Sequence, residues 1–409
     1  MSTTAEASPT RIVNGAFLAP ATAVFFFFFA FGMALPTLPI YITDTLGGSD
    51  LAVGTVVGAT AVSAIAIRPW IPAGVQRWGA TRLIAVCGIL GAISFIFSGL
   101  IGSTAGLSGL RLIAGVAQAV IMVAALIIVS SSVSDAHQGQ VISYLSVAPY
   151  MGIGLGPVVS QPILENYGPA WSFAAAGIVS LVATAAISPS AIRRPARDMH
   201  APRTKPEIYL PALVPGVVLM LGILGPVALS TFMPLYIGDL GSNSPQWIFL
   251  GYSTVILAAR ILGARIPDRL GPMITGVGST VLISVGLTGI AIAPSVLVVY
   301  LALVPFGIGI ALQYPGLLAL VISRAPAGRR STAISTFTMF FDVASGVGAV
   351  LIGVAATIAG YRVAFGVCAV AALVGLALLF VFAAATAHDP GGESESEPAV
   401  PATADSDKL

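Results

Sequence analysis

The chain has 409 residues, of which 57% are hydrophobic and 8% are charged, and its net charge is +2. A mean hydropathy of +0.98 excludes a soluble globular protein, because a soluble surface needs charged residues at about a quarter of all positions. So small a net charge gives no reason to expect a nucleic-acid partner. Divided into membrane helices of about 20 to 25 residues with short loops, the chain accommodates about twelve spans.

Six apolar stretches precede the longest polar insert of the chain. We predict that they are membrane helices and that they form a first six-helix half, residues 17–190, with spans at 17–41, 51–71, 83–101, 106–129, 141–164 and 171–187. The insert contains prolines and five basic residues, which exclude both a continuing helix and burial in a membrane. We therefore assign residues 191–209 to a cytoplasmic linker.

The same pattern restarts after the linker. We predict a second six-helix half, residues 210–386, with spans at 210–237, 247–266, 274–292, 295–321, 332–358 and 364–385. Residues 1–16 form a polar tail before a first span that is too long for a signal peptide. Residues 387–409 are acidic, contain proline and lack aromatic side chains, which predicts a disordered tail.

The basic residues predict the orientation in the membrane. If both termini are cytoplasmic, only Arg111 and Arg362 of the eighteen Lys and Arg residues fall on the outer side. Basic residues favour the cytoplasmic side of short loops. We therefore expect both termini in the cytoplasm.

The cysteines and histidines give no sign of a metal site, a disulfide or a cofactor. Cys87 and Cys368 lie singly in apolar runs of different halves, without CxxC spacing, which is typical of small buried side chains. All three histidines fall in polar segments. We expect no cofactor and no metal.

A basic, glycine-bearing hairpin occurs twice. Arg68 corresponds to Arg260, Arg77 to Arg269, and Gly79 to Gly271, all at one constant offset. The second half of the chain therefore repeats the first, in the same direction. Parallel repeats of this kind are typical of transporters whose substrate cavity lies between the halves.

Four segments carry a resemblance to a known family. They are LPTLPIY at 35–41, the hairpin at 68–82, RLIAG at 111–115 and GIGLGP at 152–157. In this order and spacing the chain resembles the major facilitator superfamily, and within it the twelve-span drug:proton antiporters, which include bacterial arabinose-efflux-like permeases. The resemblance implies an all-α membrane protein of twelve helices, in two halves around a central cavity.

The resemblance also implies a function. We expect a monomer in the lipid of a bacterial cytoplasmic membrane that exports a small amphipathic organic molecule in exchange for protons, by rocking of the two halves. A nutrient importer or a facilitator is the alternative. An integral-membrane enzyme is less well supported, since the chain has no cluster of catalytic His, Asp or Glu at one membrane face.

The second hairpin is a candidate gate. A carboxylate next to arginines at a helix end can latch one face of the protein through ion pairs and a helix N-terminus. Asp268, Arg269 and Gly271 complete such a set. The alternative is that these residues are solvated anchoring charges.

The first hairpin has an incomplete version of the same set. Arg77, Gly79 and Arg82 fit the family's motif, whereas Pro72 and Gln76 stand where it has glycine and aspartate. Gln76 can accept or donate a hydrogen bond but carries no charge, so we expect a weaker latch in this half.

Arg111 is the most informative charge of the first half. Gly115, Gln118 and Met122 follow it at helical spacing on one face. A buried arginine cannot lose its proton and must find an anion or carbonyl groups. The resemblance implies a role in proton coupling, and the alternative is an arginine that extends to the outer surface.

Asp342 is the only acid well inside a predicted span. It stands ten positions into its helix, which is about 15 Å at 1.5 Å per residue. Burial favours the neutral carboxyl, which would allow proton binding and release at physiological pH. Asp342 is therefore the candidate proton carrier. The alternative is a carboxyl bound to neighbouring hydroxyls or to a structural arginine.

The fifth span contains a candidate helix-packing motif. Gly152, Gly156 and Pro157 allow a bend and a close helix contact and resemble the antiporter signature, together with Gly115 of the fourth span. Ser160 and Gln161 replace the family's following glycine pair. Small residues are common in membrane helices, so packing alone would also explain the motif.

A cavity lining of aromatic, methionine and amide side chains would suit an amphipathic molecule. The phenylalanines of residues 25–31 are one set of candidates, although lipid contact is the better explanation for most of them taken singly. The other candidates are Met33, Gln118, Met122, Tyr150, Met220, Gln313 and Tyr314.

Overall fold

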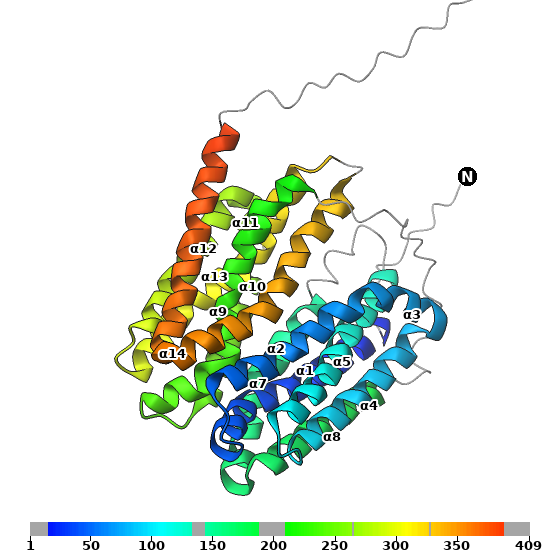
Figure 1. The fold of residues 1–409 in the computed structure, drawn as a ribbon. Helices are drawn as coiled ribbons and strands as arrows, with labels where there is room; N and C mark the ends of the chain where they lie inside the picture. The colour runs from blue at the N-terminus through cyan, green and yellow to red at the C-terminus, as the bar shows by residue number, and fades with distance from the viewer. Residues whose placement is uncertain (1–14, 133–143, 188–208, 264–265, 327–328, 388–409) are drawn as a thin grey trace, which may run out of the picture.

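The computed structural model describes residues 15–132, 144–187, 209–263, 266–326 and 329–387. This part of the chain is helical and contains no strand. Figure 1 shows two groups of long helices, one from the blue-to-cyan half of the chain and one from its green-to-red half. The predicted tails and linker lie mostly outside the described residues.

The first group contains the long helices of residues 15–187. They are α1 (Gly15–Ile40), α2 (Asp50–Ile67), α4 (Ala80–Ser98), α5 (Thr104–Ser131), α7 (Val147–Tyr167) and α8 (Pro169–Ala186). Short helix α3 (Ile71–Trp78) lies between α2 and α4 and forms the first hairpin.

The second group has the same order of elements. Its helices are α9 (Leu213–Asp239), α10 (Pro245–Leu262), the short α11 (Ile266–Leu270), α12 (Pro272–Ala291), α13 (Val296–Ser323) and α14 (Arg330–Ala387). Helix α14 is 58 residues long but is broken at Gly360, where φ is 80°.

The described residues contain twelve membrane-spanning helices. Ten helical segments of the described residues are long and apolar enough to cross a membrane, and the last of them, Thr332–Ala384, contains two spans on either side of Gly360. Helix α7 is the remaining span, and it packs between α1 and α10. Its internal Pro157 and Pro162, with polar residues at its end, make it less apolar than the others.

The two groups are copies of each other at the level of single residues. Gly79 and Gly271 both have φ of 85°, and Gly168 and Gly360 have φ of 84° and 80°. Each pair is 192 positions apart in the sequence. A positive φ is strained for every residue except glycine. In each half the chain therefore turns at the same two positions, just before the third span and just before the sixth.

Close packing holds the helices of one group together. A Cβ atom on Gly152 of α7 would lie 2.6 Å from the Phe29 nitrogen of α1, and one on Gly156 would lie 2.5 Å from the Phe29 oxygen. The missing side chains let the backbones of α1 and α7 approach closely. In lipid such packing replaces the hydrophobic effect as the force between helices.

We predict opposite effects of alanine at two helical glycines. Gly152→Ala forces α1 and α7 apart and lowers the melting temperature of the purified protein by several degrees. Gly251→Ala in α10 has no heavy atom within 4 Å of its new Cβ and raises stability slightly, by about 0.4–1 kcal/mol. Thermal unfolding in detergent measures both, and equal shifts in one direction would contradict the packing argument.

Candidate functional site

The two halves meet mainly along two helix pairs, α2 with α14 and α7 with α10, and α1 also contacts α9. We call the end of the bundle where α1 joins α2 and α9 joins α10 the closed end. The opposite end, which carries α3 and α11, is the hairpin end.

Hydrogen bonds connect α2 with α14 at the closed end. The amide nitrogen of Leu51 donates to Oγ1 of Thr357 at 3.0 Å, and the Tyr361 hydroxyl donates to Oδ1 of Asp50 at 2.8 Å. Asp50 is in the first turn of α2, and Tyr361 directly follows the break at Gly360. The two halves are thus joined by a charge-assisted hydrogen bond.

Glycines continue this contact toward the middle of the helices. A Cβ on Gly54 would lie 2.5 Å from the carbonyl oxygen of Ala349, and one on Gly58 would lie 3.1 Å from that of Gly346. Helices α2 and α14 therefore approach each other closely over about one turn. At Gly54 even a methyl group would collide with the α14 backbone.

The α7–α10 pair is joined by side chains as well. Gln161 donates through Nε2 to the Asn243 carbonyl at 3.2 Å and to Glu165 Oε1 at 2.9 Å. Gly154 packs against Ser253. Gln161 replaces a family glycine, and the structure uses its side chain to connect the two halves.

Arg260 also reaches across this interface, nearer the hairpin end. Its guanidinium donates to Ser146 Oγ at 3.1 Å and to the Tyr150 hydroxyl at 3.2 Å, and lies 4.8 Å from the centre of the Tyr150 ring. Its Nε is buried and has no hydrogen-bond partner. The contact couples a cation of the second half to neutral groups of the first.

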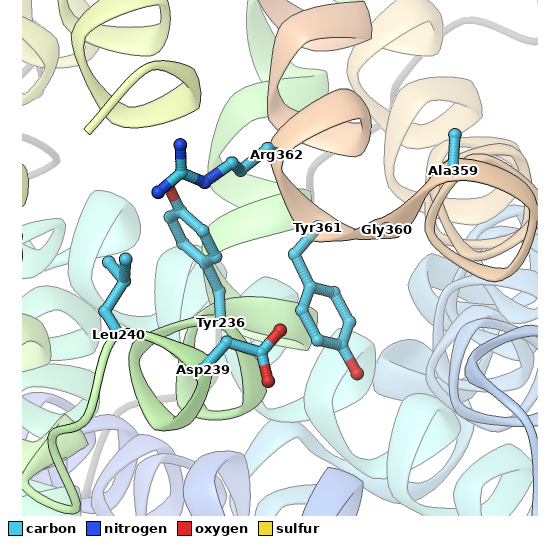
Figure 2. Close-up of a pocket in the computed structure, with 7 residues that line it drawn as sticks. All are labelled: Tyr236, Asp239, Leu240, Ala359, Gly360, Tyr361 and Arg362. Atoms are coloured by element: carbon cyan, nitrogen blue, oxygen red, sulfur yellow. The ribbon is translucent and has the colours of Figure 1, made fainter. Parts of the chain in front are cut away.

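A small pocket of about 220 Å³ lies at the closed end. Figure 2 shows it between Tyr236 and Asp239 at the end of α9 and Tyr361 and Arg362 of α14. Ligand pockets for organic molecules usually have volumes of about 300–1,000 Å³. We therefore interpret it as a crevice beside the closed contact and assign it no ligand.

The described gating side chains of the two hairpins form no hydrogen bond between the halves. Gln76, Arg77 and Arg82 are exposed, and Arg77 lies 5.6 Å from the centre of the neighbouring Trp78 ring. Arg269 is exposed at the end of α11. Among the described residues, none of these four side chains makes a hydrogen bond to the opposite half.

The glycines of the two hairpins determine where the chain turns. Gly79 and Gly271 have the same φ and direct the chain into α4 and α12. The side chain of Asp268 lies outside the described residues, so its latch stays a prediction.

Arg111 is enclosed inside the first half. It is 2% exposed and donates through NH2 to Ser98 Oγ at 3.1 Å. Its guanidinium lies 5.4 Å from the centre of the Phe95 ring and 5.9 Å from that of Phe173. Its buried Nε has no partner. The part of the chain that the structure describes offers this cation hydroxyl and ring contacts but no carboxylate at ion-pair distance.

The residues predicted to share a face with Arg111 have different surroundings. Gly115 approaches the backbone of Thr60 in α2. Gln118 and Met122 are half-buried, and the buried Oε1 of Gln118 has no hydrogen-bond partner. This face of α5 therefore contacts another helix at Gly115 and carries partly exposed side chains at Gln118 and Met122.

Asp342 lies on α14, and its side chain is outside the described residues. Its helix packs against α9, α12, α13 and α2. Phe337, five residues before Asp342, and Phe341, the residue directly before it, have rings 5.6 and 6.5 Å from the Tyr314 ring of α13. This segment of α14 is therefore held against the second half.

The remaining cavity candidates divide into buried and half-buried residues. Met33 and Gln313 are each 1% exposed and belong to helix packing, since Gln313 donates to the Val218 carbonyl at 3.4 Å. Tyr150, Met220 and Tyr314 are half-buried. Only the half-buried members remain as candidates for a lining that a substrate touches.

The sequence did not single out several residues that join the halves. Asp50, Tyr361 and Asn243 lie in or beside predicted loops, and nothing in their local sequence indicates a partner. For Arg260 a signal existed, because it lies inside an apolar run before the hairpin. The sequence alone groups it with the hairpin charges.

These observations define a class of protein: a polytopic membrane transporter, built from two duplicated helical bundles that pack together mainly along two helix pairs. The chain belongs to the Major Facilitator Superfamily, whose family model matches residues 21–349 and 220–405. It is therefore a secondary transporter.

Curated relatives agree with this assignment. An uncharacterized MFS-type transporter of Burkholderia mallei is 27% identical over 365 residues, which are 87% of this chain and 88% of that protein. One of Salmonella typhimurium is 25% identical over 369 residues, which are 88% and 94% of the two chains.

Solved structures share the fold. The nucleoside transporter NupG has a TM-score of 0.75 at 14% identity and covers 90% of this chain and 99% of its own. A bacterial homolog of the human lysosomal transporter Spinster, in an inward-facing and occupied conformation, has a TM-score of 0.74 at 14% identity, with 92% and 98% covered. Identities this low show the fold alone.

We predict that Tyr361→Phe opens the closed end. The substitution removes one hydrogen bond to a carboxylate, about 1 kcal/mol, and should raise the ratio of open to closed molecules about fivefold. Spin labels at Thr45 and Ala359, in a variant without Cys87 and Cys368, would measure the distances across this end. Tyr167→Phe, an exposed tyrosine of α7, serves as the control, and a change as large as that of Tyr361→Phe there would contradict the assignment.

Proposed function

We propose that this protein exports a small amphipathic organic molecule from a bacterial cell in exchange for protons. The proposal rests mainly on one observation: hydrogen bonds and backbone contacts join the duplicated halves at the closed end. Nearer the other end Arg260 reaches across, but the described gating side chains Gln76, Arg77, Arg82 and Arg269 form no hydrogen bond to the opposite half. A contact such as that at the closed end can form at either end in turn, as alternating access requires. The antiporter-like segment from Gly152 to Pro157 favours export.

We further propose that the hairpin end faces the cytoplasm, with both termini on that side. The arginines of both hairpins and of the linker support this, because basic residues favour the cytoplasmic side. The structure then corresponds to an inward-open state, closed toward the outside. In the outward-open state, Asp268, Arg77 and Arg269 would latch the hairpin end.

In this scheme Asp342 carries the proton and Arg111 responds to it electrostatically. A carboxyl in the middle of a membrane helix favours its neutral form and loses its proton only when the site opens to water. Arg111 is a permanently charged, enclosed group. The protein would act as a monomer, and its substrate and the proton would be its only ligands.

We predict that Asp342→Asn abolishes coupling. Purified protein in liposomes would be tested for substrate-dependent proton movement across a panel of lipophilic cations, antibiotics, sugars and siderophore-like metabolites. Movement seen with the native chain should disappear in the variant, because an amide cannot release a proton. Asp44→Asn, at an exposed position beside Thr43, should keep it. Proton movement that persists in Asp342→Asn would exclude this carboxyl as the carrier.

We predict that Arg111→Met separates coupling from stability. A buried cation without a carboxylate partner is costly, so an apolar side chain of similar length should leave the melting temperature equal or higher. Proton-coupled transport should nevertheless fall by at least about tenfold, or about 1.4 kcal/mol. A variant that melts several degrees lower but transports normally would assign Arg111 a structural role.

An importer or facilitator is the second candidate function. NupG, which shares the fold, is a nucleoside transporter. Substrate counterflow that proceeds at the full rate without a proton gradient, and is unchanged in Asp342→Asn, would favour this candidate.

A further inference from the structure

The two interfaces between the halves are copies of each other. Shifting the sequence by 192 positions converts α2 into α10 and α7 into the first part of α14. The contact of Gly154 with Ser253 has its counterpart in Gly346 with Ala61, whose Cβ lies 3.7 Å from a Cβ built on Gly346. The sequence repeat therefore relates the contacts between the halves to each other, in addition to the helices that make them.

The next turn of the α7–α10 interface contains the contact between Arg260 and Tyr150. Arg260 corresponds to Arg68 and Tyr150 corresponds to Asp342, each 192 positions away. The α7–α10 interface has an arginine and a phenol at these positions. The α2–α14 interface has an arginine and a carboxyl at the equivalent positions.

The local register of α2 and α14 agrees with this correspondence of Arg68 and Asp342 to Arg260 and Tyr150. A Cβ on Gly346 would lie 3.5 Å from Ile65 Cδ1, so this face of α14 is turned to α2. Asp342 is four residues before Gly346, on the same face. Arg68 is three residues after Ile65 and ends α2. Both positions are one turn closer to the hairpin end.

We propose that Arg68 is the partner of Asp342, facing it across the α2–α14 interface and favouring its ionised form. This inference rests on the proposed role of Asp342 as the proton carrier, and it makes Arg68 a positioning residue for that role. Arg111, enclosed between α4, α5 and α8, is then a more remote influence.

The other helices packed against α14 offer few rival charges. Between its ends α9 has no charged residue, and Asp239 lies at the closed end; α12 has no charged residue at all. Helix α13 contributes the Tyr314 phenol and, just after its last turn, Arg324, which lies 4.4 Å from the centre of the Phe382 ring. Arg329 and Arg330 precede or begin α14 itself. On the facing side of α2, Arg68 is the charged position nearest to Asp342.

The proton step is balanced without any further reactant. In the inward-open state the neutral Asp342 carboxyl transfers its proton to water, and the carboxylate forms an ion pair with the Arg68 guanidinium, which keeps its own proton. Protonation from the other side of the membrane removes the negative charge and releases Arg68. The ion pair thus connects the charge of Asp342 to the contact between α2 and α14.

The first experiment tests proximity and needs no transport. In the full-length chain without Cys87 and Cys368, Arg68→Cys is combined with either Asp342→Cys or Val343→Cys and treated with a short bifunctional thiol reagent. Val343 is exposed and points about 100° away on the same helix. We expect at least about tenfold faster cross-linking for the Asp342 pair. Equal rates for the two pairs would overturn the proposal.

The second experiment measures the pH profile of proton-coupled transport in liposomes. Removal of a neighbouring positive charge favours the neutral carboxyl, so Arg68→Gln should shift the half-maximal pH upward, by about one unit. Arg68→Lys keeps the charge and should keep the native profile. Arg324→Gln removes a cation from the same end of the neighbouring helix and should also leave it unchanged. A profile that does not move in Arg68→Gln, or moves equally in Arg324→Gln, would overturn the role.

The two experiments separate this inference from the proposed function. If Asp342 carries no proton, coupling survives in Asp342→Asn while the cross-linking result stands. If Arg68 is not its partner, Asp342→Asn still abolishes coupling but cross-linking shows no preference.

Discussion

The contact between α2 and α14 is the interaction on which the rest of this structure depends. In a bilayer two helices gain little by covering apolar side chains, since lipid covers them equally well. Gly54 and Gly58 instead bring backbones together, where many weak dispersion contacts add up. Asp50 and Tyr361 add a directed hydrogen bond at the end. Such a contact is strong only when its surfaces match, so a small rotation of one half is enough to lose it.

Duplication explains why a second contact of similar shape exists. Helices α10 and α7 are the sequence copies of α2 and α14, and Gly154 with Ser253 repeats the packing of Gly346 with Ala61. The copies have diverged at their ends, where Gln161 forms the cross-half hydrogen bond on one side and Asp50 on the other. The halves can therefore rock about two related interfaces without becoming identical in chemistry.

The sequence predicted the spans well, because lipid leaves the backbone no alternative to helix. The fourth span was expected at 106–129 and is Thr104–Ser131, and the tenth was expected at 295–321 and is Val296–Ser323. Individual contacts were harder to predict. Tyr361 and Asp50 are 311 positions apart, and only the fold brings them together. Arg260 was placed with the hairpin because local sequence does not say which face of α10 it occupies.

The asymmetry of the two copies bears directly on proton coupling. At one position of the repeat, the first copy has the Tyr150 phenol and the second has the Asp342 carboxyl, which can take up and release a proton. Arg260 lies against Tyr150 in the first copy, and Arg68 is the residue equivalent to Arg260 in the second. A duplicated pair of this kind would give one exchangeable proton for each chain: the interface of α7 and α10 would keep its cation contact in every protonation state, while that of α2 and α14 would lose or gain it with the proton. Divergence at a single position would then make one interface a constant hinge and the other a switch.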